Sequence, residues 1–120
     1  MTITILKLDH IQLCVPIGEE PMARQFYLNI LKFQEIEKPE SLKSNGGFWC
    51  QAGDVQLHIG VEKMQETLSK RHPAFLVENV AITRTYLENH AVKTQDEKPV
   101  PGVKRFSCFD PFNNRIEFLE

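Results

Sequence analysis

Polar and apolar residues alternate along several short segments of this chain and follow helical spacing in two others. Residues 9–16 (DHIQLCVP) alternate and run into Pro16 and Gly18, which predicts a strand that ends there. Glu19 and Glu20 then precede an apolar stripe at residues 23, 26, 27, 30 and 31, which predicts an amphipathic helix with acids at its positive end. The first half closes with a strand at 33–37, a polar loop at 39–47, and a hairpin of 48–51 and 55–61.

The same order of elements begins again after a polar stretch. Residues 62–71 predict a loop with a short helical turn. Asn79 is a helix N-cap candidate, so we expect a helix from there to about Asn89. The other segments predict a strand at 72–77, a strand at 91–94, a loop at 95–102, and a closing hairpin of 104–109 and 115–119.

The chain therefore contains the order strand–helix–strand–strand–strand twice, in units of about 1–62 and 72–120. Each unit has one amphipathic helix and a half-polar sheet, so neither unit can bury its apolar surface alone. We expect a single α+β domain over residues 1–120, with about eight strands and the helices packed on the apolar face of the sheet.

Composition excludes several classes of function. With 120 residues, 42% of them hydrophobic, the chain can build one compact core. The net charge of -2, with acids and bases interspersed, argues against nucleic acid as a partner, and the short apolar runs argue against membrane insertion. We see no secretion signal, and the widely spaced Cys14, Cys50 and Cys108 fit buried thiols in a reducing cytoplasm.

Period-two geometry gathers polar side chains on one face of the predicted sheet, away from the helices. Three of the four histidines lie on these strands and point to that face, which collects His10, Gln56, His58, His72 and Glu117. Antiparallel sheets often leave one face in water, so an ordinary solvated face explains the polar pattern. Imidazole and carboxylate are also the ligands that bind zinc, iron, manganese, nickel or cobalt, so a divalent metal site is an equal interpretation at this point.

Four segments of the chain resemble the vicinal oxygen chelate superfamily, which contains glyoxalases, bleomycin resistance proteins and extradiol dioxygenases. They are LDHIQLCVP, ARQFYLNILKF, HPAFLVENV and DPFNNRIEFLE. The ending is the most specific, because members typically finish with DP-x-G-N-x-x-E; Asn113 stands where glycine is common, and Asn tolerates positive φ. The resemblance covers nearly the whole chain and implies an open, curved eight-stranded sheet around one metal ion.

The resemblance also implies a set of metal ligands. His10 matches the first-strand histidine of metal-using members, His72 the histidine that opens the second unit, and Glu117 the glutamate of the closing strand. A fourth ligand, often glutamate in the family, would come from the fourth strand, where this chain has Gln56 and His58. Chemistry favours His58, since neutral imidazole binds transition metals better than an amide does, and Gln56 stays as the alternative.

The resemblance implies a metal-dependent enzyme, a lyase or isomerase of glyoxalase type or a dioxygenase, whose small-molecule substrate binds the metal through two vicinal oxygens. Glu117 is then the candidate catalytic base. Trp49, Gln56 and Arg115 are candidate substrate contacts, with Lys104 and Arg105 as further cationic candidates.

A metal-free binding protein of the bleomycin-resistance type is the alternative function, although such proteins usually lack the two histidines and the glutamate. We expect a homodimer by symmetry. The sequence leaves open whether each site belongs to one chain or is shared between two.

Overall fold

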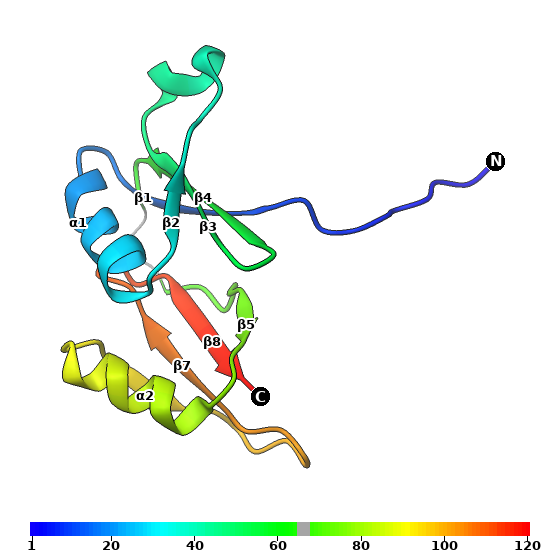
Figure 1. The fold of residues 1–120 in the computed structure, drawn as a ribbon, viewed down its shortest axis with the longest axis vertical. Coiled ribbons are helices and arrows are strands. Elements are labelled where there is room, and N and C mark those ends of the chain that lie inside the picture. Colours follow the sequence, from blue (N-terminus) through cyan, green and yellow to red (C-terminus); the bar gives the residue numbers. More distant parts are fainter. Residues whose placement is uncertain (65–67) are drawn as a thin grey trace.

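The computed structural model describes residues 1–64 and 68–120 (Figure 1). Within them, eight strands alternate with two α-helices, one π-helix and one 3-10 helix. In chain order the elements are β1 (Ile11–Pro16), α1 (Glu20–Arg24), the π-helix η1 (Gln25–Ile30), β2 (Gln34–Ile36), the 3-10 helix η2 (Glu40–Asn45), β3 (Phe48–Ala52), β4 (Val55–Glu62), β5 (Ala74–Leu76), α2 (Val80–Asn89), β6 (Thr94–Asp96), β7 (Arg105–Phe109) and β8 (Arg115–Leu119).

The strands form two sheets with the same internal order, β1-β4-β3-β2 and β5-β8-β7-β6. In each sheet the first strand pairs with the fourth in parallel, and the other neighbours are antiparallel. This confirms the predicted α+β class built from two βαβββ units. In the described part of the chain no strand of one unit pairs with a strand of the other, so β1 and β5 are open edges.

The helices lie beside the sheets, α1 with the first and α2 with the second (Figure 1). The first helix widens into a π-helix at Gln25, where the Leu31 N–H donates to the Phe26 carbonyl at 2.9 Å. Phe26 and Tyr27, consecutive residues of this segment, are both buried. Asn79 caps α2 as predicted, because its side-chain oxygen accepts a hydrogen bond from the Ile82 N–H at 2.8 Å.

Hydrogen bonds join the two units. The Tyr27 hydroxyl donates to Asp110 Oδ2 at 2.7 Å, and the Tyr86 hydroxyl donates to the Ile30 carbonyl at 2.6 Å. Asp110 also accepts the backbone N–H groups of Phe112 and Asn114, which closes the turn of the DPFNN segment. Asn113 has a φ of 69° in that turn, as predicted from its place in the motif.

Several predicted boundaries were wrong by a few residues. β1 begins at Ile11 rather than residue 9, and β5 begins at Ala74 rather than 72, because Pro73 has no N–H to give to a ladder. The strand expected at 91–94 begins only at Thr94, since Ala91 adopts a φ of 60° at the end of the helix. The polar loop at 39–47 contains η2. The helical turn expected within 62–71 includes residues 65–67, which lie outside the described residues.

Residues 1–8 extend away from the body of the molecule as an arm (Figure 1). Four apolar side chains of this arm are 73% to 88% exposed: Ile3, Ile5, Leu6 and Leu8. Such a concentration of exposed apolar residues on an extended segment is typical of a surface that another chain covers. Among the described helices, none has the length and apolar character needed to cross a membrane.

Candidate functional site

The polar face of the first sheet carries a stack of three rings. The His58 ring lies between His10 and Trp49, with centroid distances of 4.0 Å and 3.8 Å and interplanar angles of 14° and 7°. The strand register explains this stack, because Trp49 on β3 is directly opposite His58 on β4. The rings line a cavity of about 540 Å³ that also contains Gln56.

Hydrogen bonds fix which nitrogen of each histidine is free. The His10 Nδ1–H donates to Asp9 Oδ2 at 2.9 Å, so Nε2 of His10 carries the lone pair. His58 Nε2 lies 3.2 Å from Gln56 Oε1, an oxygen that only accepts, so this nitrogen is protonated and Nδ1 is free. Burial, followed by the neighbouring His10, lowers the pKa of His58 below its ordinary value.

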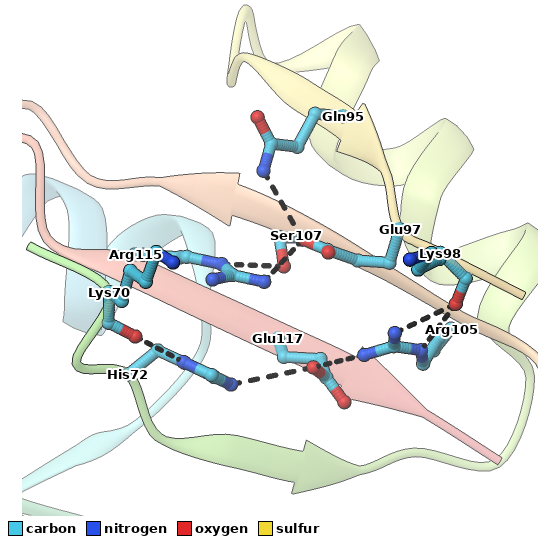
Figure 2. Close-up of polar contacts among 9 residues, drawn as sticks. All are labelled: Lys70, His72, Gln95, Glu97, Lys98, Arg105, Ser107, Arg115 and Glu117. Atoms are coloured by element: carbon cyan, nitrogen blue, oxygen red, sulfur yellow. Dashed lines mark hydrogen bonds and ion pairs between the residues drawn. The ribbon is translucent and has the colours of Figure 1, made fainter. Parts of the chain in front are cut away.

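The polar face of the second sheet holds His72 and Glu117 (Figure 2). The His72 Nδ1–H donates to the Lys70 carbonyl at 2.8 Å, and His72 Nε2 lies 3.5 Å from Glu117 Oε1. Ala74 is directly opposite Glu117 in the β5–β8 ladder, and His72 lies two residues earlier on the same face. Arg105 Nη1 donates to the same oxygen, Oε1, from the other side at 2.9 Å.

A second charged cluster lies beside this pair. Arg115 Nη2 is 2.7 Å from Glu97 Oε1, and Arg115 Nε donates to the Ser107 hydroxyl at 3.4 Å. Hydrogen bonds from the Ser107 and Gln95 side chains and from Arg115 lower the pKa of Glu97 to about 2. The sequence analysis missed Glu97 and Ser107. Ser107 could have been found, because it is a polar residue between the apolar residues Phe106 and Cys108 of β7. Glu97 lies just after β6, where no periodic pattern points to it.

The predicted site residues therefore fall into two groups. The first sheet brings together His10, Gln56, His58 and Trp49, and the second brings together His72, Glu117 and Arg115. Within residues 1–64 and 68–120, no three His, Cys, Asp or Glu side chains lie close enough to hold one metal ion. His90 lies apart from both groups, and its Nδ1–H donates to the Tyr86 carbonyl at the end of α2.

Comparison with solved structures identifies the family. A glyoxalase family protein from Bacillus anthracis shares 40% of its sequence with this chain and superposes with a TM-score of 0.92, over all of this chain and 98% of that one. No protein-family model and no curated protein sequence matches the chain. At this level of identity and coverage, the chain belongs to the glyoxalase family, and thereby to the vicinal oxygen chelate superfamily.

More distant structures share the fold. The fosfomycin resistance protein FosX from Listeria monocytogenes, crystallised with Mn(II) and sulfate, has 20% identity and a TM-score of 0.75 over 96% of this chain and 90% of its own. A glyoxalase/bleomycin resistance protein from Streptomyces has 17% identity and a TM-score of 0.66 over 92% of this chain and 99% of its own. Both are similar to this chain in architecture.

Proposed function

We propose that this protein is a metal-dependent enzyme, a lyase or isomerase of glyoxalase type or a dioxygenase, acting on a small molecule that binds the metal through two adjacent oxygens. His10, His72 and Glu117 would hold the ion. The observation that carries the proposal is the approach of His72 Nε2 to Glu117 Oε1 on the polar face of the second sheet.

This approach brings two electron-rich atoms together. With Nδ1–H donating to Lys70, a neutral His72 has only a lone pair to present to the carboxylate 3.5 Å away. A divalent cation between these atoms would turn their repulsion into coordination. The carbonyl behind His72 is the kind of outer partner that holds a ligating imidazole in one orientation. The same holds for Asp9 behind His10.

The third ligand, His10, would come from a second copy of the chain. His10 lies on the first sheet and His72 and Glu117 on the second, and no three-donor group forms among the described residues of one chain. Two features favour a symmetric homodimer that joins them: the open edges β1 and β5, and the exposed apolar side chains of the N-terminal arm. Each dimer would then contain two sites.

The remaining predicted residues take supporting roles in this proposal. His58 is the predicted fourth ligand and would bind through Nδ1, since its Nε2–H is engaged by Gln56. Gln56 is the alternative ligand and otherwise a substrate contact. Trp49 would give the substrate a flat apolar wall, Arg115 a cationic contact, and Glu117 the carboxylate that takes a proton.

Titration with Mn(II) by calorimetry tests the proposal, because FosX was crystallised with this ion. Wild-type protein should bind about one equivalent per chain, and His72→Ala should lose binding at least about tenfold. His90→Ala is the matched control, since it removes an imidazole that lies outside both groups. Equal binding by wild type and His72→Ala would contradict the proposal.

A metal-free binding protein is the second candidate function, and one contact favours it. Arg105 already neutralises the Glu117 carboxylate at 2.9 Å, so the site is electrostatically satisfied without an ion. Failure to bind Mn(II), Zn(II), Fe(II), Ni(II) or Co(II) in the calorimeter would favour this second function over the first.

A further inference from the structure

Glu117 Oε1 is contacted by two groups that a metal ion would affect differently. His72 would become a second ligand of the ion. Arg105 is a cation, so the ion would either displace it from Glu117 or be repelled by it. We propose that Arg105 competes with the metal ion for Glu117 and, once the ion holds that carboxylate, binds an anionic oxygen of the substrate. This inference rests on the proposed function and names the substrate class of the same site.

The geometry holds the Arg105 guanidinium in place without Glu117. Nε and Nη2 both donate to the Lys98 carbonyl, at 3.2 Å and 2.7 Å, so the planar group is fixed from one side. Nη1 alone reaches Glu117 (Figure 2). If Glu117 turns to an ion, Lys98 keeps the guanidinium at the site and Nη1 loses its acceptor. The half-buried Nη1 donor would then lack its charged acceptor, and a charge-assisted hydrogen bond to an anionic oxygen is stronger than one to water, so a ligand that supplies such an oxygen is favoured there.

The charges of this cluster lead to the same ligand class. Arg105 and Arg115 carry two positive charges, and Glu97 and Glu117 carry two negative ones, so the cluster balances without a metal. A divalent ion adds two positive charges, and the second sheet has no further negative charge in the cluster to offset them. The proposed partner copy would supply one negative charge, the Asp9 carboxylate that is paired with His10. Anionic substrate oxygens would neutralise the remainder.

Arg115 differs from Arg105 because the carboxylate that it pairs with would not bind the ion. Its partner Glu97 is not a predicted metal ligand, and the lowered pKa of Glu97, about 2, keeps that carboxylate charged and paired. The ion would therefore release Arg105 and leave the Arg115 pair intact. Arg115 remains a predicted substrate contact, while Arg105 is the residue that couples metal binding to anion binding.

The inferred ligand is a small oxyanion: a carboxylate, phosphonate or phosphate with a second oxygen close enough to reach the ion. Because the ion and the anion would each favour the binding of the other, they should bind with positive coupling. Metal-free protein should bind such an anion weakly, since Arg105 is then occupied by Glu117.

Metal affinity tests the competition directly. Arg105→Gln in the full chain should bind Mn(II) about 5- to 150-fold more tightly than wild type, because one competing positive charge is gone. Arg105→Lys keeps the charge and should stay near wild type. Arg84→Gln is the matched control: it makes the same substitution on α2, outside the site, where Arg84 pairs with Asp96 and lies over the Phe106 ring. Circular dichroism and solution mass confirm that each variant is folded and assembled.

Oxalate tests the second half of the inference, because it carries two adjacent oxygens and two negative charges. Bound to Mn(II)-loaded protein, oxalate should lose affinity about 5- to 150-fold in Arg105→Gln and keep its affinity in Arg84→Gln. Metal-free wild type should bind oxalate more weakly than the loaded protein does.

The outcomes separate this inference from the proposed function. If wild type binds Mn(II) and Arg105→Gln binds it equally or more weakly, Arg105 does not compete and this inference is wrong while the function stands. Unchanged oxalate affinity in Arg105→Gln would likewise overturn the anion-binding role alone. If neither wild type nor Arg105→Gln binds Mn(II), the proposed function and the inference are both wrong.

Discussion

The hydrogen bond from Tyr27 to Asp110 holds the two units of the chain together, and replacing Tyr27 by Phe removes only its hydroxyl. Both side chains are buried, and burial raises the pKa of Tyr27 well above its ordinary value, so the hydroxyl is a proton donor at any physiological pH. Asp110 keeps the Asn114 side-chain donor and two backbone N–H donors in the variant, so its carboxylate is not left without partners.

The expected cost is therefore that of one hydrogen bond to a charged acceptor, about 1.5–3 kcal/mol of the free energy of unfolding. Tyr86→Phe is the matched comparison, because it removes a hydroxyl that also joins the units but donates to a neutral carbonyl, at about 0.5–1.5 kcal/mol. With a urea m-value of about 2 kcal/mol/M, the Tyr27→Phe midpoint should fall by about 1 M.

Urea unfolding followed by circular dichroism measures both variants, at one protein concentration because assembly would add to apparent stability. A Tyr27→Phe cost below about 0.5 kcal/mol, or no larger than that of Tyr86→Phe, would show that the hydrogen bond to Asp110 does not hold the units together in the way described.

Two further predictions concern groups with shifted pKa values. The pKa of Glu97 is lowered from 4.5 to about 2 by Ser107, Gln95 and Arg115, so its stabilising contribution is full above pH 4.5 and lost as the pH falls toward 2. Glu97→Gln should therefore show a smaller loss of stability across that range than wild type in acid titrations followed by circular dichroism, and equal losses would contradict the prediction. The ring of His58 is stacked on Trp49, the one tryptophan of the chain, and its pKa is below 6.5. Protonation of His58 should quench Trp49 fluorescence with a midpoint below the ordinary histidine pKa, and His58→Gln should lack this step; a midpoint at or above the ordinary value would contradict the lowering of the His58 pKa by burial.

Period-two alternation predicted the sheets well because one face of each is buried. In the second sheet both Ser107 and Ala74 are opposite Glu117, and in the first sheet Trp49 is opposite His58. The polar residues therefore gather on one face of each sheet, as expected from the sequence. The predicted ends of strands were wrong where the backbone conformation, rather than the side-chain pattern, determines where the strand begins. Ala91 at positive φ and Pro73 without an N–H are the two clearest cases.

Side-chain partnerships were less predictable than strands. The sequence placed His72 and Glu117 on one face, and the structure brings Nε2 and Oε1 to 3.5 Å. The pairing of Arg105 with Glu117 and of Arg115 with Glu97 depends on which long side chain reaches which carboxylate across neighbouring strands and loops. Alternation fixes the face but not the partner. The sequence also left open whether His10 and His72 meet within one chain. That depends on how the two βαβββ units pack against each other, within one chain or between two.

In the proposed dimer, His10 of one chain and the pair His72 and Glu117 of another would complete each metal site. A mixed dimer of one His10→Ala chain and one Glu117→Ala chain, isolated with two different affinity tags, tests this claim most directly by its Mn(II) content. In such a dimer one shared site loses both altered ligands and the other keeps every ligand. We expect about one Mn(II) per mixed dimer and none in either parent dimer. A mixed dimer that binds no Mn(II), while wild type does, would contradict it.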